Sequence, residues 1–196
     1  MTRPRLTVEV RQQQLIETGL EIFGSTPFDR VSMDLVAERA GASRTLLYHY
    51  FSDKRQLYLA VLQMVADRML AATTVESDRP PLERFRTGLA AYLEFAEKYP
   101  EGYTTLIAGG NGSDEAVREL CEAARWRGLG EILRTLGVED PPPALKICLR
   151  GWQGFQEGAT IEWLKRRDLP RERLLDLIAN ALVASLQLLA DDDPVP

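Results

Sequence analysis

Two short helical patterns separated by a single glycine constrain residues 31 to 57 more tightly than any other part of this chain. The first pattern begins at Ser32, whose hydroxyl can cap free amides at a helix start. Gly41 interrupts that pattern, and Ser43 is placed to cap a second helix over residues 44 to 50. Small side chains beside the glycine allow the two helices to cross closely. The stretch therefore predicts a helix-turn-helix.

The second helix of this motif carries polar side chains on one side. Arg44 and Tyr48 are four residues apart, as are Thr45 and His49, so each pair shares a helical face. Arginine can grip guanine O6 and N7 with two hydrogen bonds, and threonine can meet a thymine methyl group or a phosphate. These side chains favour a recognition helix that lies in the major groove of DNA.

Polar groups at the helix starts extend the predicted DNA contacts. Hydroxyl groups suit phosphate oxygens, and Lys54 stands near a helix start, where an ammonium and free amides can meet one phosphate. Core packing is the alternative for a face rich in tyrosine, and metal binding or base catalysis is the alternative for the only histidine. The predicted DNA-binding residues are Ser32, Ser43, Arg44, Thr45, Tyr48, His49, Tyr50 and Lys54.

The charge balance is unusual for a DNA-binding chain, because the formal net charge is −5. Residues 1 to 55 contain eight Lys or Arg and seven Asp or Glu, a balance of +1, and the remainder carries −6. Phosphate binding needs only a local basic face, which Arg3 and Arg5 of the N-terminal arm, Arg44 and Lys54 can supply. We expect modest, salt-sensitive affinity for DNA.

Helical periodicity continues through the rest of the chain, and no run alternates like a half-buried strand, so the predicted fold class is all-α. Turn residues and prolines separate the helices. The expected helices cover about residues 7–23, 32–40, 44–50, a long segment capped by Ser52, 82–98, a short piece with Leu106 and Ile107, 115–136, 144–167 and 171–189.

A chain of 196 residues has room for one small and one medium domain. We expect a DNA-binding domain over residues 1–55, a second helical domain over 56–190 and an unstructured tail over 191–196. We expect no stretch to approach the roughly 20 apolar residues needed to span a bilayer, and the start of the chain lacks the apolar core of a signal peptide. The expected location is the cytoplasm.

The two cysteines fit a reducing compartment. Cys121 and Cys148 are expected to be reduced thiols that act as small apolar side chains. A regulatory disulfide between them is the alternative, although no neighbouring residue predicts a thiol of lowered pKa.

Residues 28 to 57 resemble the DNA-binding domain of the TetR family of bacterial transcriptional regulators. The residues that carry the resemblance are Val31-Ser32, Val36-Ala37-Glu38-Arg39-Ala40-Gly41, Ser43-Arg44-Thr45-Leu46-Leu47-Tyr48, His49-Tyr50-Phe51 and Lys54-Arg55-Gln56-Leu57. Thr45 stands where the family usually has glycine, and Tyr50 stands where it often has histidine. Because Thr45 adds a side chain that can read a base, the operator sequence does not transfer from relatives.

The resemblance implies a homodimer whose C-terminal helical domain serves dimerisation and binds a small effector between its helices. Such a site is largely apolar, with a few groups such as Tyr92, Gln153 or Gln156 orienting the ligand. The implied function is a regulator, most simply a repressor that a small hydrophobic or amphipathic molecule releases from its operator. The candidate effector-binding residues are Phe85, Tyr92, Phe95, Trp126, Trp152, Phe155 and Gln156.

A stripe of glycines marks the helix expected over residues 144–167, and each glycine costs about 1 kcal/mol relative to alanine within a helix. Missing side chains allow close helix approach, either inside the subunit or across a seam between two subunits, and both interpretations stay open. The helix expected over residues 171–189 has an apolar stripe wider than one contact face requires, so it is expected to pack on its own domain and on a second subunit. The candidate dimer residues on these two helices are Gly151, Gly154, Gly158, Ile178, Leu182 and Leu186.

Two other functions stay open from the residues alone. One is a helical ligand-binding protein or enzyme with a relic helix-turn-helix, although no nucleophile–base or metal motif supports catalysis and no cofactor is predicted. The other is a protein-binding module that uses Tyr48 and His49 to hold a partner. Footprinting on DNA upstream of the gene separates these classes.

Overall fold

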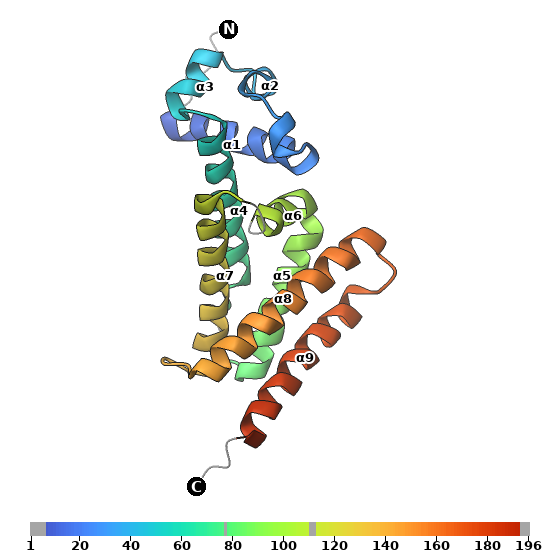
Figure 1. The fold of residues 1–196 in the computed structure, drawn as a ribbon. Helices are drawn as coiled ribbons and strands as arrows, with labels where there is room; N and C mark the ends of the chain where they lie inside the picture. Colours follow the sequence, from blue (N-terminus) through green and yellow to red (C-terminus); the bar gives the residue numbers. More distant parts are fainter. Residues whose placement is uncertain (1–6, 77, 110–112, 193–196) are drawn as a thin grey trace. The chain divides into compact units, whose positions relative to one another are not determined.

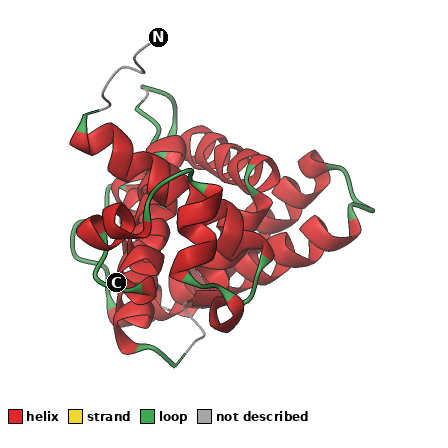
Figure 2. Ribbon diagram, turned by 90° about the horizontal axis from the view of Figure 1, so that it is seen from above, coloured by secondary structure: helices red, strands yellow, loops and turns green. Residues whose placement is uncertain are grey.

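The computed structural model describes residues 7–76, 78–109 and 113–192, and every regular element among them is a helix (Figure 1, Figure 2). These residues form no β-strand, which confirms the predicted all-α class. The elements in chain order are α1 (Val8–Ser25), the 3-10 helix η1 (Phe28–Arg30), α2 (Met33–Arg39), α3 (Arg44–Tyr50), α4 (Lys54–Thr73), α5 (Pro81–Lys98), α6 (Pro100–Gly109), α7 (Glu115–Leu136), α8 (Pro143–Arg166) and α9 (Arg171–Asp192).

Side-chain caps define the two short helices, as the sequence predicts. The Ser32 hydroxyl accepts from the Leu35 amide at 3.2 Å, and the Ser43 hydroxyl accepts from the Leu46 amide at 3.1 Å. Gly41 adopts a φ of +59°, a left-handed conformation that glycine reaches without strain. The turn between α2 and α3 therefore favours glycine at this position.

The start of α4 differs from the prediction. Ser52 is expected to cap this helix, but the Asp53 side chain accepts from the Gln56 amide at 2.8 Å and takes that role. The helix consequently begins one residue further along, at Lys54. Both residues are good caps by type, so composition alone does not decide between them.

The residue contacts divide the chain into two compact units, which we describe separately. Parts of α4 and α7 belong to each unit. Unit 1 comprises Met1–Asp67 and Glu101–Glu122, and unit 2 comprises Arg68–Pro100 and Ala123–Pro196.

The predicted functional boundary between residues 55 and 56 lies inside α4, within unit 1. Of the expected tail, residues 191–192 belong to the last turn of α9, and residues 193–196 lie outside the described residues. Arg3 and Arg5 of the N-terminal arm also lie outside them.

The core of unit 1 anchors α3. Leu15, Val36, Leu47 and Leu57 have no exposed surface and belong to one apolar cluster that α1 to α4 build together. Burial of one such side chain stabilises the fold by about 1.5–3 kcal/mol. Because Leu47 is the buried residue of α3, it determines which side of this helix faces outward.

Close approaches between helices fix the place of α1 in unit 1. A Cβ atom on Gly19 would lie 3.0 Å from Val61 Cγ2, so side chains of α4 reach the backbone of α1. A Cβ atom on Gly24 would lie closer than 3.0 Å to the Cβ of Glu101 on α6. Glycine at these two positions therefore sets the distance of α1 from α4 and α6.

An ion pair links the start of α4 to the start of α7 within unit 1. Arg55 donates to both oxygens of Asp114, at 2.5 and 2.9 Å, and Asp114 also accepts from the Val117 amide at 3.1 Å. The Arg55 guanidinium, followed by the Val117 amide, lowers the pKa of Asp114 to about 2. Asp114 is therefore ionised at neutral pH and caps α7.

In unit 2, α8 and α9 pack along each other and α5 packs on both (Figure 1). The Trp152 indole donates to the Ile178 carbonyl at 2.9 Å and joins α8 to α9 in the interior. Glu97 of α5 accepts from Arg167 at 2.8 Å and from Arg171 at 3.1 Å. These ion pairs hold α5 at the turn between the last two helices.

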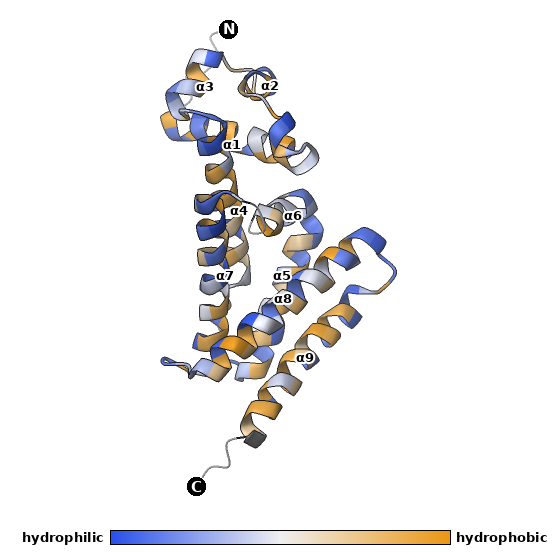
Figure 3. Ribbon diagram, viewed as in Figure 1, coloured by the Kyte–Doolittle hydropathy of each residue, from blue (hydrophilic) through white to orange (hydrophobic). Residues whose placement is uncertain are grey.

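Apolar residues run along most of α9 (Figure 3). By length and composition, Arg171–Ala190 could cross a membrane, which corrects the expectation that no stretch reaches that length. Core helices of soluble proteins pass the same test. In α9, Ile178 and Leu182 are buried within unit 2, whereas Leu177 and Leu188 are exposed. Only part of its apolar surface therefore faces the core.

Both cysteines are free thiols. Cys121 is buried, and its thiol donates to the Leu106 carbonyl at 3.3 Å. Burial raises the pKa of the Cys148 thiol, which reduces the thiolate fraction that reacts with oxidants.

Gly24→Ala should destabilise the protein, because the added methyl group collides with the Glu101 side chain and α1 or α6 must shift. We expect a loss of about 1–3 kcal/mol in urea unfolding followed by circular dichroism. Gly130→Ala is the matched control, since Gly130 is exposed on α7 and its added Cβ would meet nothing within 4 Å. There alanine should stabilise the helix by about 0.5–1 kcal/mol. Equal effects at both positions would contradict the close approach.

Candidate DNA-binding surface

The outer side of α3 is polar and accessible. Arg44, Thr45 and His49 are exposed, and Tyr48 keeps 41% of its surface exposed. Leu47, in contrast, is fully buried in the unit 1 core. The structure thus brings four of the sequence-predicted DNA-binding residues to the accessible side of one helix.

The Arg44 guanidinium is held from two sides. Its Nε lies 3.2 Å from Asp34 Oδ1 on α2, and its Nη1 donates to Asp34 Oδ2 at 3.3 Å. Its Cζ lies 5.5 Å from the centre of the Tyr48 ring. The Arg44 and Asp34 side chains are 64 and 63% exposed, so the pair contributes little to stability. Its effect is to orient the guanidinium.

The capping serines remain able to bind a partner outside the chain. Ser32 and Ser43 each accept from a backbone amide, and each hydroxyl keeps its own hydrogen to donate. Both residues are exposed. A phosphate oxygen can therefore accept from either hydroxyl without disturbing the helix start.

Tyr50 occupies a different environment from the other predicted residues of α3. It is half-buried and packs against the apolar cluster of unit 1. Its ring lies 5.3 Å from the His49 ring and 6.5 Å from the Phe51 ring. Much of the Tyr50 side chain therefore packs α3 against the unit 1 core, and only the rest is accessible to DNA.

Lys54 is engaged within the chain. Its Nζ donates to the Phe28 carbonyl at 2.8 Å and lies 4.3 Å from the centre of the Phe28 ring. The ammonium thus fastens the start of α4 to η1, and a phosphate would have to compete with these contacts. Like the pairing of Arg44 with Asp34, this contact could not be predicted from the sequence. Each contact joins residues across a turn whose geometry the sequence does not define.

The predicted effector-binding residues of unit 2 differ in exposure: some are at the surface and the others are buried. Trp126 and Phe155 are at the surface, 40 and 42% exposed. The rings of Phe85 and Trp152 lie 5.7 Å apart, where α5 meets α8. The buried members of the set are Phe85, Tyr92, Phe95, Trp152 and Gln156.

The glycine stripe of α8 faces away from the interior of unit 2. Gly151, Gly154 and Gly158 are exposed, and a Cβ atom on any of them would meet nothing within 4 Å. Of the two sequence-based interpretations, tight packing inside the subunit is therefore wrong. A seam with a second subunit stays a prediction.

On α9, two of the predicted dimer residues lie elsewhere than expected. Ile178 and Leu182 are 0 and 2% exposed and belong to the interior of unit 2, and Leu186 is half-buried. The large apolar side chains that α9 leaves exposed are Leu177 and Leu188. The stripe of α9 is apolar on more than one side, so its periodicity does not tell which leucines face inward.

Two models of known families match this chain. The one described as "Bacterial regulatory proteins, tetR family" matches residues 15–61, which include the whole of α2 and α3. The one described as "Tetracyclin repressor-like, C-terminal domain" matches residues 81–185, more than half of the chain. The chain belongs to the TetR family of bacterial regulatory proteins.

Individual proteins agree with the family match. A TetR-family transcriptional regulator of known structure from Streptomyces coelicolor is 32% identical, with a TM-score of 0.84 over 96% of this chain and 85% of that chain. The transcriptional activator FasR of Mycolicibacterium smegmatis is 34% identical over 105 residues. The transcriptional regulator RutR of Escherichia coli K12 is 30% identical over 95 residues.

These two sequence matches are partial. They cover 53 and 48% of this chain, and 48% of FasR and 45% of RutR. The chain thus matches less than half of the length of either relative.

Lys54→Met should lower stability, because it removes the ammonium that donates to the Phe28 carbonyl and lies over the Phe28 ring. We expect a loss of about 1 kcal/mol in urea unfolding. Lys146→Met is the control, since Lys146 is exposed on α8, and it should change stability by less than about 0.5 kcal/mol. If both variants unfold at the wild-type urea concentration, Lys54 does not fasten α4 to η1.

Proposed function

We propose that the protein is a sequence-specific DNA-binding transcriptional regulator whose α3 enters the major groove. The observation that carries this proposal is the accessible polar side of α3, with Arg44, Thr45, Tyr48 and His49, opposite the buried Leu47. A short helix anchored on one side and polar on the other is the usual reader of base edges. FasR and RutR, named as transcriptional regulators of the helix-turn-helix type, support the same class.

The contacts divide into those that position the protein and those that read sequence. The hydroxyls of Ser32 and Ser43 would donate to phosphate oxygens, which fixes the register of α3 on the duplex. Arg44 is the main reader, since two of its N–H groups match O6 and N7 of guanine. Asp34 repels phosphates and holds Arg44, so it would direct the guanidinium towards a base edge.

A homodimer suits a recognition helix of this kind, because two half-sites one helical turn apart require two copies of α3. The outer face of α8 offers three exposed glycines with open space above them, beside the exposed Ile147 and Phe155. Leu177 and Leu188 add exposed apolar surface on the adjacent α9. A twin subunit on this face would remove apolar area from water at about 25 cal/mol per Å².

Unit 2 is the proposed effector-binding part. Buried aromatic residues such as Phe85, Tyr92 and Trp152 would supply an apolar lining, and Gln156 would supply a polar group. In the proposed mechanism the dimer represses transcription by occupying its operator. A small hydrophobic or amphipathic effector then favours a dimer whose α3 helices no longer match the half-site spacing. Reversal of a 1:99 balance requires about 10⁴-fold tighter effector binding to the released form.

The proposal places the protein in the cytoplasm with its operator DNA, and assigns the exposed surface of α9 to a partner subunit. The competing classes are an enzyme or ligand carrier with a relic motif and a protein-binding module. DNA binding that depends on Arg44 and Tyr48 separates the proposal from all of them.

Footprinting on DNA upstream of the gene is the direct test. The wild-type dimer should protect two half-sites about 10 base pairs apart, centre to centre. Arg44→Ala should weaken binding about tenfold or more and relax the preference for the contacted guanine. Tyr48→Ala should weaken binding because it removes a ring from the accessible side of α3 and from beside the guanidinium.

Arg118→Ala is the matched control for this test, since Arg118 is an exposed arginine of α7. Its footprint should equal that of the wild type at the same salt concentration. The proposal fails if the wild type protects no upstream DNA at low salt, or if Arg44→Ala and Tyr48→Ala both bind like the wild type.

Gly154→Leu should separate the dimer without unfolding the subunit, because the free subunit has open space at this position and a partner helix would not. Sedimentation velocity should shift from the mass of two chains towards that of one. Gly130→Leu is the control, since its Cβ also meets open space on an exposed position of α7. A Gly154→Leu variant that sediments as the wild-type dimer would exclude this face of α8 from the seam.

A further inference from the structure

The buried face of α8 is more polar than a helical core requires. Its members recur at helical spacing, and two amides and a hydroxyl interrupt an otherwise apolar stripe. Buried polar groups nearly always have hydrogen-bond partners, so each exception needs a physical explanation. The buried residues of α8 are Leu149, Trp152, Gln153, Gln156, Thr160 and Trp163.

Two oxygen atoms on this face are exceptions. Gln153 Nε2 donates to the Arg125 carbonyl at 3.2 Å, but Gln153 Oε1 is buried and has no partner among the described residues. Thr160 has no exposed surface, and its Oγ1 also lacks a partner there. Each unpaired buried oxygen destabilises the free protein, and a ligand that supplied the missing bond would recover that loss.

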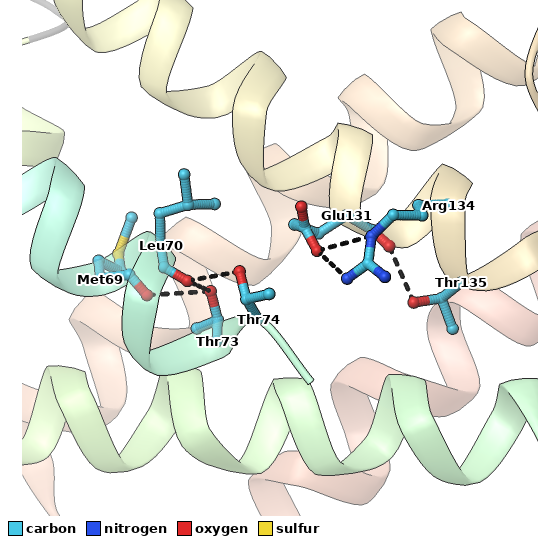
Figure 4. Close-up of polar contacts among 7 residues, drawn as sticks. All are labelled: Met69, Leu70, Thr73, Thr74, Glu131, Arg134 and Thr135. Carbon is cyan, nitrogen blue, oxygen red and sulfur yellow. Dashed lines mark hydrogen bonds and ion pairs between the residues drawn. The ribbon is translucent and has the colours of Figure 1, made fainter. Parts of the chain in front are cut away.

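Other threonines of unit 2 satisfy their hydroxyls on the preceding helical turn (Figure 4). Thr73 donates to the Met69 carbonyl at 2.9 Å, and Thr135 donates to the Glu131 carbonyl at 2.8 Å. Thr160 has the same kind of carbonyl one turn earlier in α8 and does not use it. Its unpaired hydroxyl is therefore a property of this site and not of threonine in a helix.

The charges beside Gln153 are already compensated. Arg125 and Glu157 are 9 and 13% exposed and form two hydrogen bonds, at 2.9 and 3.1 Å. Separating a buried pair of this kind is costly, because each charge would be left without its partner. This part of unit 2 therefore offers a neutral polar surface and disfavours a charged ligand group.

On the neighbouring α7, one glycine has open space at its Cβ position. Gly128 lies one turn after Arg125 on α7 and is half-buried, yet a Cβ atom on it would meet nothing within 4 Å. Gly128 is three residues along α7 from Arg125, whose carbonyl Gln153 contacts. An amide oxygen accepts hydrogen bonds and cannot donate one, so a ligand placed there must be a donor.

We propose that the effector is an uncharged, elongated molecule with hydroxyl or N–H groups, held by Gln153 Oε1 and Thr160 Oγ1 on the buried face of α8. This inference rests on the proposed effector-binding role of unit 2 and names the chemistry of the ligand. The two residues are two helical turns apart, so their Cα atoms are about 10 Å apart. A ligand with a polar group at each end and an apolar chain between them fits this spacing and the surrounding aromatic residues.

The alternative is a carboxylate ligand. Arg84 Nε of α5 is also buried without a partner among the described residues, and a guanidinium favours anions. An anionic effector would use Arg84, whereas the proposed effector uses Thr160 and Gln153. Three probes with the same chain length separate these possibilities: 1,8-octanediol, 1-octanol and octanoate.

Isothermal titration of the full chain, free of DNA, measures the affinity for each probe. We expect 1,8-octanediol to bind most tightly and octanoate least tightly. Thr160→Val should weaken diol binding about fivefold, the effect of one net hydrogen bond, and Gln153→Leu should do the same. Thr160→Ser, which keeps the hydroxyl, should retain the affinity. Thr87→Val is the control, because the Thr87 hydroxyl is exposed and already donates to the Glu83 carbonyl at 2.8 Å.

Thermal unfolding without ligand tests the premise separately. If the Thr160 hydroxyl lacks a partner in the free protein, Thr160→Val should keep or raise the Tm. A lowered Tm would overturn the proposal, as would octanoate binding more tightly than the diol, equal diol affinity in wild type and Thr160→Val, or no binding of any probe at millimolar concentration. None of these measurements involves DNA, so their failure is distinct from a failed footprint.

Discussion

The position of α3 depends on how closely α1 can approach its neighbours. Because Gly19 has no side chain, side chains of α4 pack against the backbone of α1. Gly24 likewise allows the Cβ of Glu101 on α6 to approach α1 closely. With α1 at this distance, Leu15 and Leu47 meet in one buried cluster. The short α3 would not be stable as an isolated helix, so this packing rather than intrinsic propensity holds it. The polar side that we assign to DNA follows from the burial of the opposite side.

Local interactions in this chain are predictable, and contacts across turns are not. The serine before α3 and the glycine before that serine define a helix whose bounds, Arg44–Tyr50, match the prediction to the residue. Caps depend on a few neighbouring residues, which the sequence contains. The pairing of Arg44 with Asp34 depends on the angle between α2 and α3, and the contact of Lys54 with Phe28 depends on a loop. The inward side of α9 depends likewise on where α5 and α8 pack.

The two units place polar side chains differently. In unit 1 the polar residues with a proposed role are on the surface and the core is apolar, so sequence periodicity identifies them. In unit 2 polar residues enter the core itself: Gln153 and Thr160 occupy positions that periodicity assigns to apolar packing. Periodicity marks such positions as inward-facing but does not say what they bind. The family relationship likewise defines the fold and the recognition helix, whereas the proposed chemistry of the effector follows from individual residues of this chain.

The uncovered face of α8 and α9 makes the abundance of the protein part of its proposed function. Each single chain exposes the α8 glycines together with Leu177 and Leu188, and each carries one copy of α3. Well below the dissociation constant of the dimer, the number of dimers grows with the square of the number of chains, so halving expression would leave about a quarter of the operator-competent species. A regulator assembled through this face therefore responds to its own copy number more steeply than a monomeric one.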